Sequence, residues 1–404
     1  MSGGGRGVSA PRCSLVGMRI LHTSDWHLGR SFHGVGMLGA QQQFIDRLVE
    51  TVREQEVDAV LIAGDVYDRA LPGVDVVRLL DSALDRITAA GAKVILSSGN
   101  HDSAARLGFG SRIFERGGVY LRTRISEIPD PVLLETGGAP VAVYGIPYLE
   151  PRLAAPELEV DTPHHETVIG EAVRRIREDV QRRAAEGSPV LPVVMAHVFA
   201  SGGITSDSER DLTVGGVGAV PLDLFDPFTY TALGHLHGRQ ELSPSVRYSG
   251  SPLPYSFSEA RQQKGGLLVE FDAGGLVSVE PVLWPAPRRL AVLKGRLEDL
   301  LADAGLTDAE DAYCQITLTD DERPAKAMER LRTRFPDTLV LSFEPASGPR
   351  TANQTYSQRL ARATDDLEIC CGFLDHVRSR QADEQEKKLF AEVLSKVQSS
   401  EAAQ

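Results

Sequence analysis

Several polar groups in this sequence could bind a metal ion or move a proton, and each follows a short apolar segment. Asp25 and His27 follow the first segment, and Asp65 and Asp68 follow the second. Three later segments are followed by Asn100, His101 and Asp102, by His197, and by His235 and His237. Carboxylate, amide and imidazole groups bind divalent transition metals, and imidazole is also a common acid or base in catalysis. The sequence therefore predicts metal-assisted chemistry.

The apolar segments that precede these groups have the pattern of buried β-strands. Strands are expected at Arg19–Thr23, Ala59–Ala63, Lys93–Ser97, Val141–Tyr144, Val190–Ala196, Thr229–Leu233 and Gly266–Phe271. Apolar residues at helical spacing predict helices over Gln41–Gln55, Asp75–Ala90 and Thr167–Ala185. This alternation is typical of an α/β layered domain, in which ligands bind at the carboxyl ends of the strands. The polar groups are thus expected to converge, with His235 and His237 on one side of an extended chain.

Seven residues are candidate metal ligands, which is too many for one ion. They are Asp25, His27, Asp65, Asn100, His197, His235 and His237. Two ions fit the set better, with Asp65 as the bridging carboxylate. Such ions, ~3.5–4 Å apart, bind a phosphate and lower the pKa of a bridging water, which is the chemistry of phosphoester hydrolysis. We expect His101 to donate a proton or hydrogen bond to the phosphate or leaving oxygen, and Asp68 to orient His101 or a water.

Each fragment alone has a simpler explanation. An aspartate after a strand often caps a helix, and Gly-Asp or Gly-Asn often forms a turn. Five fragments in one order, each after a predicted strand, leave little room for coincidence. Together they match the pattern D-x-H, GD-x-x-D, GNH-D/E, H and GH-x-H, and in this the sequence resembles the calcineurin-like metallophosphoesterases.

Longer motifs resemble one bacterial branch of that family, the DNA nuclease subunits that work with an ATPase subunit. These motifs are Thr23–Gly29, Ala63–Asp68, Ser98–Ser103, Tyr248–Pro252 and Glu368–Phe373. The likeness runs from Met18 to about Val397. It is more specific than the family pattern, because Trp26 and the loop Ser249–Pro252 are not needed to bind metal.

The resemblance implies a four-layer β-sandwich flanked by helices, with a smaller α/β capping domain and a helical C-terminal tail. It implies one metal on Asp25, His27 and His237, a second on Asn100, His197 and His235, Asp65 between them, and His101 as the catalytic histidine. Archaeal and eukaryotic relatives have a histidine where this chain has Asp68, so the phosphate contact of that histidine is not carried over. The metal implied is Mn²⁺, although the ligand set also suits Fe, Zn or Co.

The resemblance also implies a biological setting. The expected activity is ATP-dependent 3′–5′ exonuclease action on double strands and endonuclease action on single strands and hairpins, in DNA recombination, replication and break repair. The expected partners are DNA and the ATPase subunit, with a homodimer of this chain inside a heterotetramer.

The chain divides into four predicted parts. Residues 1–17 are rich in Gly and Ser and are predicted to be a disordered tail. Residues 18–284 are predicted to form the nuclease domain. After Trp-Pro-Ala-Pro, residues 285–350 form the capping domain, and residues 351–404 form a helical region for partner binding. In the capping domain we expect strands at Leu290–Leu293, Tyr313–Leu318 and Thr338–Phe343, and helices at Leu297–Ala304 and Ala325–Arg334.

The net charge and composition of the chain limit the classes of function that it can have. The net charge of −13 argues against a large basic surface that holds nucleic acid, so the ATPase partner is expected to supply much of the grip on DNA. The charge mildly favours an alternative, a small-molecule phosphodiesterase acting on cyclic nucleotides or similar phosphoesters. The capping domain and tail, which such a substrate does not need, disfavour it. Four irregularly spaced cysteines and no apolar run of ~20 residues predict a cytoplasmic protein that does not span a membrane.

Three other features have two possible explanations each. The basic run from Arg174 to Arg183 is interleaved with acids, which favours a solvated helix face over a phosphate contact. Tyr255 and Phe257 could stack on a splayed base or pack against a strand. The apolar residues of the tail could dock on helices of the partner or fold back on the small domain.

Overall fold

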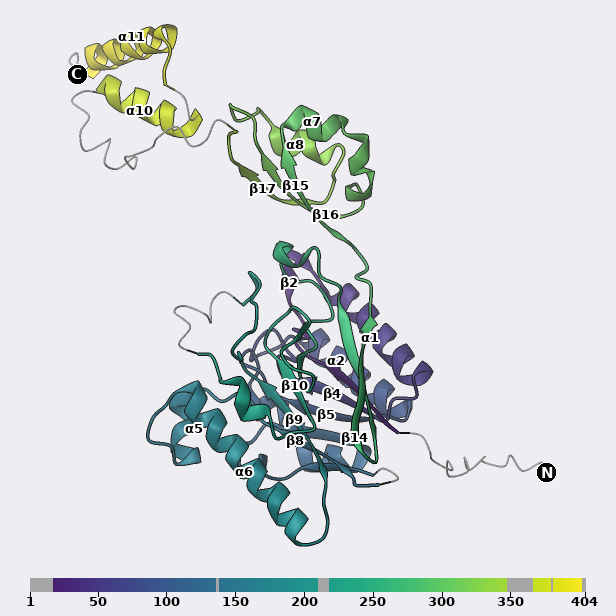
Figure 1. The fold of residues 1–404 in the computed structure, drawn as a ribbon. Helices are drawn as coiled ribbons and strands as arrows, with labels where there is room; N and C mark the ends of the chain where they lie inside the picture. The colour runs from purple at the N-terminus through teal and green to yellow at the C-terminus, as the bar shows by residue number, and fades with distance from the viewer. Residues whose placement is uncertain (1–16, 136–137, 210–217, 347–365, 379–380, 402–404) are drawn as a thin grey trace. The chain divides into compact units, whose positions relative to one another are not determined.

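The computed structural model describes residues 17–135, 138–209, 218–346, 366–378 and 381–401. The chain separates into two compact units, which divide after Pro287 (Figure 1). Residues 1–16 of the predicted disordered tail, and residues 351–365 of the predicted helical region, lie outside the described part.

The first unit contains two six-stranded sheets, with the orders β14-β13-β1-β4-β5-β6 and β11-β12-β10-β9-β8-β7. The strands of the first sheet are β1 (Met18–Thr23), β4 (Ala59–Ala63), β5 (Lys93–Ser97), β6 (Val119–Arg122), β13 (Gly265–Asp272) and β14 (Gly275–Leu283). Those of the second are β7 (Val132–Leu134), β8 (Val141–Gly145), β9 (Leu191–His197), β10 (Tyr230–Gly234), β11 (Gln240–Glu241) and β12 (Val246–Tyr248). A separate hairpin is formed by β2 (Ser31–Phe32) and β3 (Val35–Gly36).

The two sheets pack face to face, and helices cover both outer faces. Ile20, Leu61 and Ile95 of the first sheet share a core with Val193, Met195 and Tyr230 of the second. Helices α1 (Leu38–Glu54) and α2 (Val74–Ala89) lie on the first sheet, and α5 (Pro151–Leu158) and α6 (His165–Ala185) lie on the second (Figure 1). The predicted α/β fold of four layers is confirmed.

Parallel pairing brings the functional loops to one edge. Strands β1, β4 and β5 are parallel neighbours, so the loops that follow them meet at their carboxyl ends. Strands β9 and β10 are parallel neighbours in the second sheet. The two edges meet where Nδ1 of His197 donates a hydrogen bond of 3.0 Å to the backbone oxygen of Ala63.

The second unit contains a parallel three-stranded sheet of β15 (Leu290–Gly295), β16 (Tyr313–Leu318) and β17 (Thr338–Phe343). Helices α7 (Leu297–Ala302) and α8 (Ala327–Arg332) bury Leu297 and Leu331 against Ile316 of the sheet. Two further helices, α10 (Asp366–Arg378) and α11 (Glu384–Glu401), pack against each other. Both α7 and α8 are shorter than predicted. Helix α7 ends where a 3₁₀ segment, Ala304–Ala309, takes over.

The edge strands and the short helices escaped prediction. Strand β14 carries Pro281 and alternates polar with apolar residues only weakly, because only Gly275 of this strand is buried. Strands β6 and β7 have four and three residues, too few for a periodic pattern. The short helices α3 (Ala104–Leu107) and α4 (Ser111–Phe114) follow the third predicted loop. Among the described helices, none is both long and apolar enough to span a bilayer.

The contact between the two sheets predicts the effect of a single methyl group. A Cβ added at Gly234 would lie 1.8 Å from the backbone oxygen of Ala63, so Gly234→Ala must push the sheets apart. We expect it to lower the free energy of unfolding by about 2–3 kcal/mol in urea denaturation. The matched control is Gly170→Ala inside α6, where nothing lies within 4 Å, and it should raise stability by up to about 1 kcal/mol. Equal stability of Gly234→Ala and the unsubstituted chain would contradict this account.

Candidate metal centre

All nine residues predicted for the site lie at the shared edge of the two sheets, eight of them on loops and His197 as the last residue of β9. They are Asp25 and His27 after β1, Asp65 and Asp68 after β4, Asn100 and His101 after β5, His197 at the end of β9, and His235 and His237 after β10. The predicted ligands other than Asn100 are less than 9% exposed. The structure therefore brings all nine together.

The first cluster consists of Asp25, His27 and His237. One ligand atom from each lies within 4.8 Å of the others. Nε2 of His27 lies 3.1 Å from Nε2 of His237. Nδ1 of His237 lies 3.3 Å from a carboxylate oxygen of Glu259, which can only accept, so the lone pair of His237 is on Nε2. Ring nitrogens that converge in this way fit a cation between them.

The second cluster consists of Asp65, Asn100, His197 and His235. Nδ1 of His197 donates to the backbone oxygen of Ala63, which leaves its Nε2 toward the cluster. That Nε2 lies 3.0 Å from Oδ1 of Asn100 and 3.3 Å from Oδ2 of Asp65. The ring of His235 lies 5.2 Å from the ring of His197. When His197 is neutral, its Nε2 is therefore an acceptor beside oxygens of Asn100 and Asp65, as a metal ion requires.

Asp65 stands between the clusters. Its Oδ2 lies 3.3 Å from Nε2 of His197 and 3.5 Å from Nε2 of His27. Its Oδ1 accepts a hydrogen bond of 2.9 Å from the backbone N–H of His101. One oxygen is therefore held by the backbone, and the other is aimed at the histidines of both clusters.

The buried anions of the centre need positive charge. Burial raises the pKa of Asp25. Burial also pushes the pKa of Asp65 upward, but His197 and His27 outweigh it and hold that pKa well below its usual range. Burial lowers the pKa of His197, yet Asp65 and Asp25 outweigh it and raise the pKa to about 9. The raised pKa of His197 shows that the buried carboxylates favour positive charge beside them, and a divalent ion would supply such charge. Buried carboxylates, an amide oxygen and imidazoles fit such an ion.

His235 and His237 converge by a different route from the one predicted. An extended chain would place both side chains on one side, but His235 has a φ of 108° and breaks the extended conformation. Its ring contacts His197, whereas the ring of His237 lies 5.0 Å from that of His27. One short loop therefore serves both clusters.

Backbone strain is concentrated at the centre. Among the described residues other than glycine, eight have a positive φ, and four of them are predicted ligands: Asp25, His27, Asp65 and His235. Such conformations cost of order 1–3 kcal/mol each and persist where function requires them. The neighbouring glycines explain the Gly-Asp and Gly-Asn pairs. A Cβ at Gly64 would lie 2.3 Å from Nδ1 of His197, and one at Gly99 would lie 2.1 Å from Oδ1 of Asp65.

His101 is half-buried beside the first cluster, with its ring 4.7 Å from that of His27. Its Nδ1 donates a hydrogen bond of 3.0 Å to the backbone oxygen of Asp68. Asp68 thus contacts His101 through its backbone, which the sequence did not predict. The Asp68 carboxylate lies 3.9 Å from Nε of Arg30 and 3.7 Å from Nε of Arg69.

Sequence reasoning missed the buried ion pair behind His237. Glu259 is 1% exposed and Lys264 is 7% exposed. Nζ of Lys264 lies 2.5 Å from Glu259 and also donates to the backbone oxygen of His237 (2.8 Å). Burial pushes the pKa of Glu259 upward, but Lys264 and His237 outweigh it and hold that pKa far below its usual range. The pair therefore fixes His237 at both its ring and its backbone. The sequence signal was weak, because an isolated Glu and Lys in a loop look solvated.

The loop Ser249–Pro252, recognised only as a motif, also supports the ligands. Oγ of Ser249 lies 2.9 Å from Oγ of Ser24, which donates to Asp25 (2.5 Å). Ser251 donates its backbone N–H to the oxygen of His237 (3.1 Å). The structure also assigns a role to Asp102, whose carboxylate accepts backbone N–H bonds from Val66, Tyr67 and Gly99. It ties the second and third loops together.

His22, the aromatic pair Tyr255 and Phe257, and the basic run of α6 are packed or ion-paired and lie outside the set of ligands. His22 is buried and lies 2.9 Å from the hydroxyl of Tyr230, so it is structural. Tyr255 and Phe257 are each 5% exposed, which favours packing over stacking on a base. In α6, Arg174 and Arg182 form ion pairs with Glu171 and Asp179 of the same helix, and Arg177 donates to a backbone oxygen. The basic run is thus an ion-paired helix face.

Comparison with known proteins agrees with this geometry. Residues 18–201 match the family model described as calcineurin-like phosphoesterase. Residues 286–393 match the model SbcD_C, described as the type 5 capsule protein repressor C-terminal domain.

Similar solved structures include a dimetal phosphatase from Danio rerio, with a TM-score of 0.40, 11% identity and coverage of 67% of this chain and 100% of that one. The protein TT1561 of Thermus thermophilus has a TM-score of 0.36 and 12% identity, covering 66% and 99%. GAP50, the anchor in the inner membrane complex of Plasmodium, has a TM-score of 0.37 and 10% identity, covering 83% and 99%.

The buried pair predicts a loss of metal affinity on substitution. Glu259→Gln keeps the shape of the side chain but removes the charge that orients His237. Changes of this kind behind a ligand cost about 10–100-fold in metal affinity, and we expect that loss for Mn²⁺ in calorimetric titration. The matched control is Glu280→Gln on exposed β14, which should bind as the unsubstituted chain does. Unchanged binding by Glu259→Gln, with folding verified by circular dichroism, would overturn the assignment.

Proposed function

We propose that this chain, which matches the calcineurin-like phosphoesterase model over residues 18–201 and the SbcD_C model over residues 286–393, is a metal-dependent DNA nuclease subunit of the SbcD type. The observation that carries the proposal is the pair of buried clusters that Asp65 links by approaching His27 of one and His197 of the other, found in a chain with this second domain. A phosphoesterase domain alone would support only hydrolysis of some phosphoester.

The proposed ligands are Asp25, His27 and His237 for one ion and Asn100, His197 and His235 for the other, with Asp65 between them. Two bound divalent ions, Mn²⁺ in our proposal, would polarise the phosphate and lower the pKa of a water. The proposed role of His101 is to donate a proton or a hydrogen bond. Because its Nδ1–H is held by the oxygen of Asp68, the exchangeable position is Nε2, which when protonated can donate to the phosphate or the leaving oxygen.

We further propose that an SbcC-like ATPase in the cytoplasm is the partner, and that the complex acts as an ATP-dependent 3′–5′ double-strand exonuclease and single-strand and hairpin endonuclease in recombination, replication and break repair. The net charge of −13 supports a division of labour in which the partner holds the duplex. Residues 285–350 would cap the site, and the region from 351 would bind the partner. In α11, Leu389 and Val393 are 58% and 50% exposed, as a docking face requires.

An exposed apolar surface supports the proposed homodimer. Leu71 and Val74, near the start of α2, are 73% and 68% exposed, and Phe109 and Ile113, at α3 and α4, are 81% and 71% exposed. Arg106 donates to the backbone oxygen of Ala70 and so joins the two segments. Large apolar side chains that gather on a surface mark an interaction site, and two copies of the same surface suit a twofold dimer. The partner copy in the heterotetramer would cover them.

A small-molecule phosphodiesterase that acts on cyclic nucleotides or similar phosphoesters is the alternative. The acidic charge favours it, because a small phosphoester needs no extended basic surface. The C-terminal domain match disfavours it.

The nuclease proposal predicts cleavage of end-labelled duplex and hairpin DNA in Mn²⁺, with stimulation by the SbcC-type partner and ATP. His101→Ala should lower the rate by about 10²–10⁴-fold, because it removes a proton donor. Mn²⁺ binding in the same variant, measured by calorimetry, should persist. The matched control is exposed His164→Ala, which should cleave normally. Turnover of bis-p-nitrophenyl phosphate without DNA cleavage would favour the alternative function.

The dimer proposal predicts a change of mass. Phe109→Asp combined with Ile113→Asp should convert the dimer to a monomer in light scattering at micromolar concentration, because two charges would be buried unpaired. The control is Leu153→Asp on α5, which is equally exposed at 79% but lies on another element. A monomeric mass for the unsubstituted chain would refute the homodimer.

A further inference from the structure

The ligand histidines differ in what holds the ring nitrogen that faces away from the centre. Nδ1 of His197 donates to the backbone oxygen of Ala63, and Nδ1 of His237 lies 3.3 Å from the carboxylate of Glu259. Nδ1 of His27 is buried, and no group among the described residues forms a hydrogen bond with it. A buried polar group without a partner is rare and costly, so this nitrogen needs an explanation.

The other ring nitrogen of His27 faces the first cluster. Nε2 of His27 lies 3.1 Å from Nε2 of His237 and 3.5 Å from Oδ2 of Asp65. A cation bound there would take the lone pair of Nε2, which leaves the hydrogen of the neutral ring on Nδ1. In the metal-bound protein, His27 therefore needs an acceptor for its Nδ1–H.

The carboxylate of Asp68 lies beside that nitrogen. Its Oδ1 is 3.7 Å from Nδ1 of His27, just beyond the distance of a hydrogen bond. The backbones of the two loops are joined, because the N–H of His27 donates to the oxygen of Asp65 (2.9 Å) and the N–H of Asp68 donates to the oxygen of Leu28 (3.1 Å). The backbone of Asp68 is thus fixed, and a small rotation of its side chain is enough to reach His27.

The carboxylate of Asp68 has no hydrogen bond to any of the described residues. Nε of Arg30 lies 3.9 Å from Oδ1, and Nε of Arg69 lies 3.7 Å from a carboxylate oxygen, which are ion-pair distances only. The side chain of Arg69 is 82% exposed, so its ion pair contributes little. His101 donates to the backbone oxygen of Asp68. The carboxylate is therefore available to His27.

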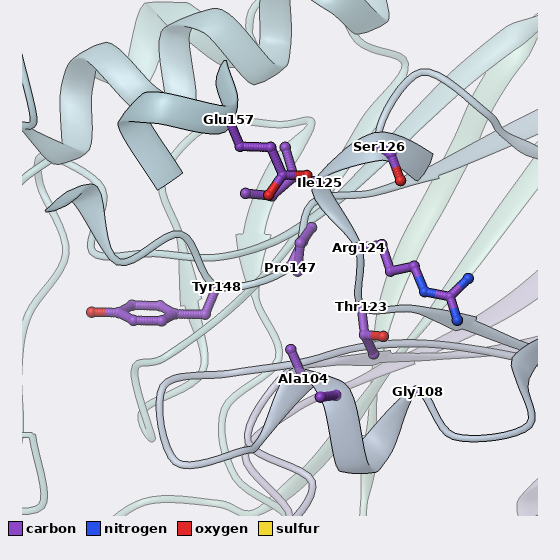
Figure 2. A pocket seen from close by; sticks show the side chains of 10 residues that line it. Ala104, Gly108, Thr123, Arg124, Ile125, Ser126, Pro147, Tyr148 and Glu157 are labelled. Carbon is purple, nitrogen blue, oxygen red and sulfur yellow. The ribbon is translucent and has the colours of Figure 1, made fainter. Parts of the chain in front are cut away.

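A ligand in the cavity beside α3 would not supply a different acceptor. This cavity, of about 500 Å³, is lined by none of the nine residues of the metal centre, so a molecule bound in it would not touch His27. Figure 2 shows the ring of Tyr148 turned away from the other side chains that line it. Asp68 is the acceptor that the structure offers.

We propose that Asp68 is a positioning residue for His27. In the metal-bound protein its carboxylate accepts the Nδ1–H of His27 and fixes the ring with Nε2 toward the ion. A carboxylate behind a histidine ligand also makes that ligand more basic. The inference rests on the metal centre of the proposed function and extends it, because it assigns the Asp68 carboxylate to His27 and not to His101.

The test compares two substitutions that remove the same negative charge. Asp68→Ala leaves no acceptor, whereas Asp68→Asn retains an oxygen. In calorimetric titration with Mn²⁺, Asp68→Ala should lose about 10–100-fold in affinity at one of the two sites, and Asp68→Asn should lose less. The matched control is Asp46→Ala on α1, because Asp46 also pairs with an arginine (Arg86, 2.7 Å) but lies on another element. It should bind Mn²⁺ as the unsubstituted chain does.

Nuclear magnetic resonance follows the hydrogen bond itself. In protein with isotope-labelled histidine and bound Zn²⁺, which suits the same ligands and is diamagnetic, one ring N–H proton signal should move upfield in Asp68→Ala and move less in Asp68→Asn. If Asp68→Ala does not fold, the shift in Asp68→Asn still tests the hydrogen bond, because an amide oxygen is a weaker acceptor than a carboxylate.

Two results would overturn the assignment. One is equal Mn²⁺ affinity of Asp68→Ala and Asp68→Asn. The other is a lower rate on bis-p-nitrophenyl phosphate at saturating Mn²⁺ with unchanged Mn²⁺ affinity, which would assign Asp68 to His101. An unsubstituted chain that binds no Mn²⁺ would refute the metal centre and this inference together. None of these readouts uses DNA, so a failure of DNA cleavage would refute the nuclease proposal alone.

Discussion

The rest of the structure depends on one constraint. At the carboxyl ends of the strands, acceptor atoms from different loops lie very close to one another. Oδ2 of Asp65 lies within 3.5 Å of ring nitrogens from both clusters, and Oδ1 of Asn100 faces His197 at 3.0 Å. Without a cation these groups repel one another or must take up protons. With one, each becomes a ligand. The loops therefore hold these groups in an arrangement that is energetically favourable only when positive charge lies between them.

Packing in the surrounding protein offsets the backbone strain of that arrangement. Four predicted ligands adopt left-handed backbone conformations, and Gly64 and Gly99 leave no room for a methyl group beside His197 and Asp65. Strain of this size must be offset by rigid surroundings. The sandwich core between β4 and β9 supplies part of that rigidity, and the buried Glu259–Lys264 pair supplies another part behind His237. Stability of the fold and precision of the centre are therefore linked.

Much of the fold and of the ligand set could be predicted from sequence, because the end of a strand depends on residues that are neighbours in the sequence. The strand Ala59–Ala63 is found with the expected bounds, and knowledge of parallel sheets places Asp65 beside Asp25. The rest depends on contacts between distant segments. Nothing near Glu259 indicates that it holds His237, and no periodicity shows that His235 leaves the extended chain or that Asp68 contacts His101 through its backbone. Sequence patterns identify the ligands, whereas packing decides how they are oriented.

The acidic charge and the anionic substrate are reconciled by where the positive charge lies. The arginines of α6 that could contact phosphate are engaged, since Arg174, Arg175 and Arg183 each pair with an acid of their own helix. The positive charge that attracts a phosphate would then come from the metal ions of the centre. Their attraction extends over a few ångströms and does not follow a duplex. Under the proposed function, we expect such a protein to recognise a phosphodiester locally and to bind long DNA weakly. Within that proposal, specificity for DNA would come from a partner that holds the duplex or from contacts with the nucleotide at the site.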